Sequence, residues 1–90
     1  MVERPTLSPH ARYRWDSIRQ QHQLVFPEGV LVLNHSSAAI ITRCDGRSFG
    51  ALVEELDHDF PGESRIDDVV DFLQEMMSRG LVYDDAEQSR

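Results

Sequence analysis

The chain has 90 residues, of which 40% are hydrophobic and 28% charged, and its formal net charge is −7. A chain of this size and composition is typical of one small globular domain, with little room for an enzyme cleft and its supporting residues. The negative charge argues against binding to a nucleic-acid backbone, which requires clustered Lys and Arg side chains.

The first third of the chain predicts an N-terminal arm followed by a small sheet. Residues 1–11 contain Pro5 and Pro9 and predict a flexible, extended arm. Three short strands follow: the first alternates between polar and aromatic residues, and the third is apolar on both faces. Short connections, the second of them the turn Pro27–Gly29, predict an antiparallel meander. The predicted strands are Arg12–Asp16, Gln23–Phe26 and Val30–Leu33.

Helices are predicted after Asn34. The first runs from about Ser36 or Ser37 to Cys44 with Asn34 or Ser36 as its cap, the second follows a Ser48 cap and reaches Phe60, and the third follows an approximate capping box at Ser64–Asp67 and continues to Arg79. Gly80 ends the third helix, Leu81–Tyr83 is an extended apolar segment, and residues 84–90 form a polar tail. Three strands followed by three helices predict an α+β fold resembling a winged helix-turn-helix.

The third predicted helix carries more apolar surface than the core of a small domain requires. One stripe is expected to face the core, and a second stripe beside it is expected to face a groove; together they span roughly 160° of the helix. The remaining side is acidic. The predicted core stripe is Ile66, Val70, Leu73 and Met77; the predicted groove stripe is Val69, Phe72 and Met76; the acidic residues are Asp67, Asp68, Asp71 and Glu75.

No pattern in the sequence predicts catalysis, a metal site or a cofactor. The four histidines, His10, His22, His35 and His58, form no metal-binding pair, and the glycines form no phosphate-binding loop. Cys44, the single cysteine, is expected to be a buried structural thiol. The N-terminus does not resemble a signal peptide and no segment is long and apolar enough to span a membrane, so a cytoplasmic protein is expected.

The third strand and the third helix together predict a binding groove. A peptide could add a strand to the edge formed by Val30–Leu33 and place side chains against the helix. The same edge could instead pair with a second copy of the chain, so homo-oligomerisation remains an alternative. A DNA-reading role is disfavoured because the third helix is acidic. The aromatic residues Tyr13, Trp15, Phe26 and Phe60 are expected to belong to the core.

Several segments, taken in order, resemble the PqqD family. They are Arg14–Arg19 (RWDSIR), Leu24–Val30 (LVFPEGV), Leu33–Asn34, Ala39–Ile41, Cys44–Gly46 (CDG) and Gly80–Val82 (GLV). Trp15 stands where the family more often has Phe. The resemblance covers about Arg12 to Tyr83.

The resemblance implies a non-enzymatic peptide chaperone of pyrroloquinoline quinone (PQQ) biosynthesis, with residues 12–83 as its peptide-recognition domain. Such a protein binds the precursor peptide PqqA and presents it to the radical SAM enzyme PqqE. It is the prototype of the leader-recognition domains of ribosomally made peptide natural products (RiPPs). Arg12, Arg14 and Arg19 are candidates for the surface that meets the enzyme. The implied peptide-binding residues are Val30, Leu31, Val32, Leu33, Val69, Phe72, Leu73 and Met76.

Overall fold

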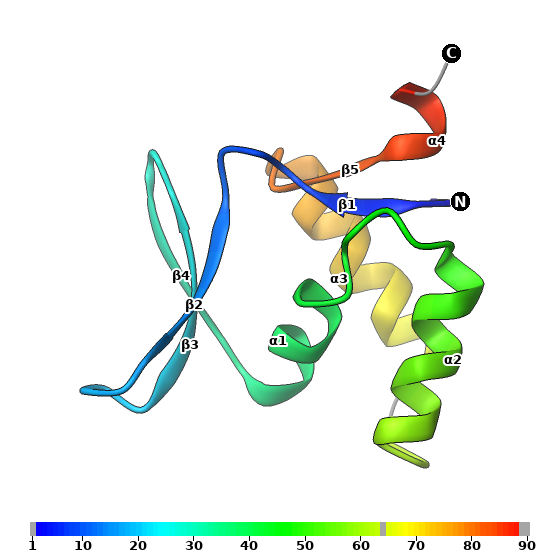
Figure 1. The fold of residues 1–90 in the computed structure, drawn as a ribbon, viewed down its shortest axis with the longest axis horizontal. Coiled ribbons are helices and arrows are strands. Elements are labelled where there is room, and N and C mark those ends of the chain that lie inside the picture. The colour runs from blue at the N-terminus through cyan, green and yellow to red at the C-terminus, as the bar shows by residue number, and fades with distance from the viewer. Residues whose placement is uncertain (1, 64, 89–90) are drawn as a thin grey trace.

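The protein is described by a computed structural model that covers residues 2–63 and 65–88. Figure 1 shows a three-stranded sheet at one end of the molecule and the helices at the other. The α+β arrangement predicted from the sequence is confirmed. The elements are β1 (Pro5–Leu7), β2 (Arg12–Asp16), β3 (Gln21–Phe26), β4 (Gly29–Leu33), α1 (His35–Ile41), α2 (Phe49–Asp59), α3 (Ile66–Ser78), β5 (Val82–Asp84) and α4 (Asp85–Gln88).

Strands β2, β3 and β4 form the predicted antiparallel meander, in that order. Leu24 of β3 lies between Tyr13 of β2 and Leu31 of β4 and is completely buried. Cross-strand partners share a face of a sheet, so this row marks the face that packs toward the core. The turn after β3 is shorter than predicted, because Gly29 already pairs with Phe26 as the first residue of β4.

The N-terminal segment differs from the predicted flexible arm. Pro5–Leu7 forms β1, which pairs antiparallel with β5 in a separate two-stranded sheet, and Val2 and Pro5 are buried. The segment is extended, as proline favours, but its partner lies more than 70 residues further along the chain, and no local pattern identifies such a partner. The predicted extended segment Leu81–Tyr83 corresponds to β5, which lies one residue later at Val82–Asp84; Asp84, predicted to begin the polar tail, is buried, and α4 follows it.

Side-chain caps begin the first two helices where the sequence predicts them. The Asn34 carboxamide accepts from the Ser37 N–H at 2.8 Å, and the Ser48 hydroxyl accepts from the Ala51 N–H at 3.1 Å. The predicted cap of the third helix at Ser64 lies outside the described residues; Arg65 is the N-cap and makes no side-chain capping bond. Gly80 follows the helix with φ of 74°, the left-handed conformation expected there.

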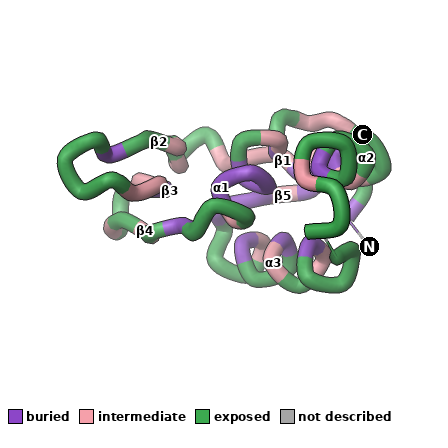
Figure 2. The backbone as a smooth tube through the Cα atoms, turned by 90° about the horizontal axis from the view of Figure 1, so that it is seen from below, coloured by how far each residue is buried: buried purple, intermediate pink, exposed green. Residues whose placement is uncertain are grey.

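One hydrophobic core joins the sheet to the helices. Figure 2 shows the buried positions concentrated on α1, on the inner sides of α2 and α3, and on β5. Within the described part of the chain, no helix is long and apolar enough to cross a membrane.

Candidate functional site

Among the strands that the structure describes, β4 has a neighbour on one side only, which is β3. Phe26 and Gly29 flank the two-residue turn and form the first hydrogen-bonded pair of β3 and β4. Along the two strands, pairs that exchange backbone hydrogen bonds then alternate with pairs that do not. This alternation directs the backbone N–H and C=O groups of Val30 and Val32 away from β3. β4 therefore presents the donors and acceptors of two residues at a free edge, as a strand-adding partner requires.

The side chains of β4 divide between the two faces of the sheet. Val30 and Val32 are 54% and 57% exposed, whereas Leu33 is buried and Leu31 is half-buried against the core. The strand is apolar on both sides because its inner face closes the core, while its outer face lies open to solvent. The two exposed valines form a short apolar strip along the edge strand.

Helix α3 packs against the core with the middle of its apolar surface. The buried residues come from both predicted stripes. Val69, Leu73 and Met76 are buried, and at ~100° per residue they lie within about 60° of each other. Of the residues predicted to face the groove, Met76 is buried in the core, and Val69 is also buried but lines the pocket described below. Ile66, predicted to be a core residue, is 55% exposed because it lies at the helix start, beyond the reach of the core.

The half-buried residues of α3 lie on the two flanks of this central face. Phe72 lies on one flank, and Val70 and Met77 lie on the other. The physical reason is that a helix lying on a core centres its apolar sector on that core, which leaves both margins partly exposed. Phe72 is therefore the most exposed residue of the predicted groove stripe.

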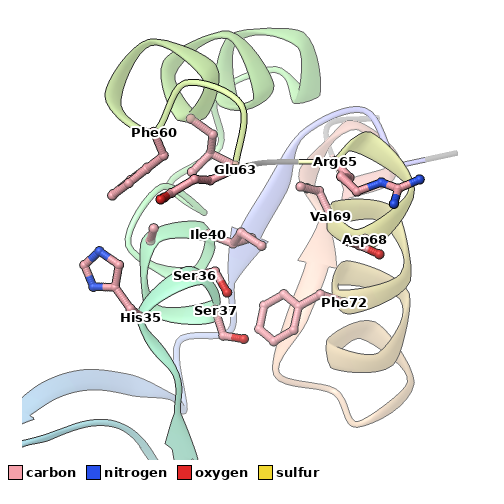
Figure 3. A pocket seen from close by; sticks show the side chains of 12 residues that line it. His35, Ser36, Ser37, Ile40, Phe60, Glu63, Arg65, Asp68, Val69 and Phe72 are labelled. Carbon is pink, nitrogen blue, oxygen red and sulfur yellow. The ribbon is translucent and has the colours of Figure 1, made fainter.

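A pocket of about 290 Å³ lies between α1, the end of α2 and the first half of α3. In Figure 3 the Ser37 side chain of α1 and the Phe72 ring of α3 point toward each other, and Ile40 extends from α1 toward α3. The volume is sufficient for a large apolar side chain. The lining residues are His35, Ser36, Ser37, Ala39, Ile40, Leu56, Phe60, Glu63, Arg65, Asp68, Val69 and Phe72.

The pocket and the free edge of β4 are close together along the chain. β4 ends at Leu33, and the first three residues of α1, His35–Ser37, already line the pocket. Figure 2 shows β4 and α3 on the same side of the molecule, with α1 between them. An extended peptide that pairs with β4 and continues past α1 would therefore reach the pocket.

Arg43 connects the end of α1 with α2, which forms one wall of the pocket. Its guanidinium lies 3.0 Å from the Glu55 carboxylate and 2.5 Å from that of Asp59, and it stacks 5.9 Å from the centre of the Phe60 ring. The hydrogen bond from His58, together with the smaller effect of the Arg43 guanidinium, holds the pKa of Asp59 below its usual value. These contacts fix the position of Phe60 at the pocket.

Four rings form a row from the sheet to this wall. The ring centres lie 4.8 Å apart for Trp15 and His22, 5.9 Å for His22 and His35, and 5.3 Å for His35 and Phe60. Trp15 is 46% exposed, so its expected place in the core is wrong, although Phe60 does pack against the core. Four separate sequence segments contribute to the row, so local spacing gives no sign of it.

Cys44 has the environment of a structural thiol, as predicted. It is buried, and its Sγ donates to the Ile40 carbonyl at 3.3 Å. Burial, with the nearby Asp45 carboxylate, raises the pKa of the Cys44 thiol to about 12. A thiol with such a pKa is protonated at neutral pH and is a poor nucleophile. Among the described residues, no group of His, Cys, Asp and Glu side chains is placed to hold a metal ion.

The structure brings some of the predicted peptide-binding residues to the surface and leaves others in the core. Val30 and Val32 are exposed, and Leu31 and Phe72 are half-buried. Leu33, Val69, Leu73 and Met76 are buried, so they support the site from beneath. The prediction missed the pocket residues of α1; their position directly after an edge strand was the available signal.

Comparison with known proteins gives consistent matches across most of the chain. The family model described as "Coenzyme PQQ synthesis protein D (PqqD)" matches residues 21–82. The PqqA binding protein of Stutzerimonas stutzeri is 35% identical over 81 residues, covering 88% of each chain. The PqqA binding protein of Azotobacter vinelandii is 38% identical over 80 residues, covering 87% of each chain.

A solved structure matches the fold. It is the solution NMR structure of the PqqD truncation of Methylobacterium extorquens PqqCD, described as a functional, stand-alone RiPP recognition element. The TM-score is 0.65 at 21% identity, with 88% of this chain and 87% of that chain covered. The fold is therefore shared, and with the family match and the relatives it shows that this chain belongs to the PqqD family.

Proposed function

We propose that this chain is a non-enzymatic peptide chaperone of PQQ biosynthesis. It binds the precursor peptide PqqA by strand addition to β4 and presents the peptide to the radical SAM enzyme PqqE. Family membership and the names of the relatives support PqqA as the ligand. The observation that carries the proposal is the free edge of β4, which leads directly into a partly apolar pocket between α1 and α3.

Strand addition supplies affinity that does not depend on the peptide sequence. The N–H and C=O groups of Val30 and Val32 would bond to the peptide backbone, and the exposed valine side chains would pack beside alternate peptide residues. The edge of β2 is also free, but β4 is the edge that lies on the same side as α3 (Figure 2).

The pocket supplies selectivity for the peptide side chain that enters it. Its apolar lining includes Ile40, Val69 and Phe72, and the lining residues Glu63, Arg65 and Asp68 are exposed. An apolar peptide residue would be buried here, and charged neighbours in the peptide would meet these charged residues.

Calorimetric titration with PqqA tests the proposal. We expect saturable binding of one peptide per chain, with a negative heat-capacity change from apolar burial. Absence of binding by the folded protein would contradict it. In the same experiment, Phe72→Ala should weaken binding while the protein stays folded.

The same edge also permits self-association. Two copies could pair their β4 strands antiparallel about a two-fold axis, which would place the exposed valines of one copy beside those of the other. Such a dimer would compete with the peptide, because both use the same backbone groups. Light scattering over a concentration series, with and without PqqA, distinguishes the two: peptide binding should convert any dimer to a monomer.

A further inference from the structure

The outer face of the three-stranded sheet, which lies opposite α1, is basic and apolar. Two rows of cross-strand partners cover it: Arg12, Val25 and Val30, and Arg14, Gln23 and Val32. Figure 1 shows the sheet at the end of the molecule, with α1 on its inner side and no labelled element on its outer side.

The two arginines on this face lack acidic partners. Both are exposed, and within the described part of the chain neither guanidinium forms an ion pair, whereas Arg19, Arg43, Arg47 and Arg79 do. The one carboxylate at the end of the same face, Asp16, is already occupied by Gln23, by Arg19 and by the N–H groups of the following turn.

This charge contrasts with the rest of the chain. Residues 1–34 contain four Arg and three acidic residues, whereas residues 35–90 contain five Arg and thirteen acidic residues. A basic and apolar face on an otherwise acidic protein selects a partner with carboxylates beside an apolar patch, and it repels acid-poor, basic surfaces.

We propose that the outer face of the β2–β3–β4 sheet docks an acidic, apolar surface of the enzyme that receives the peptide. The inference rests on the proposed function. A peptide strand added beside β4 places every second side chain on this same outer face. A protein bound there would contact the chaperone and the bound peptide together, as transfer of the peptide requires.

A second copy of the chain fits this face less well. A two-fold contact would place Arg12 and Arg14 against their own copies, which costs like-charge repulsion. A contact with the acidic side of α3 of another copy would be heterologous, so it would build a ring or a filament instead of a two-fold dimer.

The test uses the full chain, with PqqE and PqqA as separate titrants. The variant Arg12→Glu/Arg14→Glu reverses the charge of the outer face. The control Arg4→Glu/Arg79→Glu makes the same change in net charge with exposed residues elsewhere. Circular dichroism confirms that both variants are folded. Affinity for PqqE is measured by biolayer interferometry at several salt concentrations, with and without PqqA.

We expect the outer-face variant to bind PqqE at least tenfold more weakly, with a flatter salt dependence, and to bind PqqA within about twofold of the wild-type affinity. Unchanged PqqE affinity, or an equal loss in the control, would overturn the inference, as would loss of PqqA binding or a change in oligomeric state. If the wild type does not bind PqqA, the proposed function fails. The titration with PqqE alone still tests whether the outer face of the sheet binds the enzyme.

Discussion

The carboxylate of Asp84 accepts a hydrogen bond from the backbone N–H of Arg4 at 2.9 Å, which joins two residues 80 positions apart. The same carboxylate accepts from the N–H groups of Glu3 at 3.0 Å and Ala86 at 3.1 Å. Asp84 is buried at the end of β5 and thereby attaches the N-terminal strand to the rest of the fold.

Asp84→Ala should destabilise the protein by about 1–3 kcal/mol, because it leaves backbone N–H groups without an acceptor. Urea unfolding followed by circular dichroism measures the change. The control is Asp57→Ala, an exposed residue of α2, which should change the free energy of unfolding by less than about 0.5 kcal/mol. Equal effects of the two substitutions would refute the role assigned to Asp84.

The Asp84 carboxyl also predicts a loss of stability in acid. Burial raises its pKa, but the N–H groups of Glu3, Arg4 and Ala86 lower it more, so the pKa lies below the usual value. A carboxyl with a lowered folded-state pKa stabilises the protein above its unfolded-state pKa, about 4, and this contribution is lost as pH falls through the folded-state pKa. The difference in Tm between wild type and Asp84→Asn should therefore be larger at pH 6 than at pH 2.5. A difference independent of pH would contradict this assignment.

Phe72→Ala should weaken PqqA binding about tenfold or more, because the ring borders the pocket between α1 and α3. Val70→Ala is the matched control, since Val70 is also half-buried but lies on the opposite flank of α3. Calorimetric titration should show near wild-type affinity for the control. If both variants bind equally, the pocket is not part of the peptide site.

The local features of this fold can be predicted from the sequence. Asn34 and Ser48 cap helices because their side chains accept backbone N–H groups within the next three residues, and the pattern of residues alone identifies them. The pairing of Pro5–Leu7 with Val82–Asp84 forms only when the whole fold brings the two segments together. The local sequence of the N-terminal segment therefore predicts a flexible arm and not a strand.

The candidate site also combines features that the sequence predicts with features that depend on the tertiary fold. The edge position of Val30–Leu33 follows from a meander of three strands. The periodicity of α3 does not show which of its apolar residues are buried. Its apolar surface is continuous, and the sequence does not show which part of that surface faces the centre of the core. The pocket also requires His35 and Phe60, which come from other helices and become neighbours only through tertiary packing.

Val32→Pro should reduce PqqA affinity at least tenfold by removing an N–H from the free edge of β4. It should leave the β3–β4 pairing intact, because the Val32 N–H points away from β3. Val32→Thr, which keeps the N–H and a β-branched shape, serves as the control and should bind within about threefold of wild type. Equal binding by the two folded variants would exclude a backbone hydrogen bond at Val32.

Amide hydrogen exchange at β4, measured by NMR with and without PqqA, tests strand addition most directly. Without the peptide, the amides of Val30 and Val32 should exchange faster than that of Leu31, which faces β3. Saturating PqqA should slow exchange at Val30 and Val32 at least tenfold and leave Tyr13 and Trp15, on the free edge of β2, unchanged. Bound peptide with no protection at Val30 and Val32 would contradict strand addition to β4.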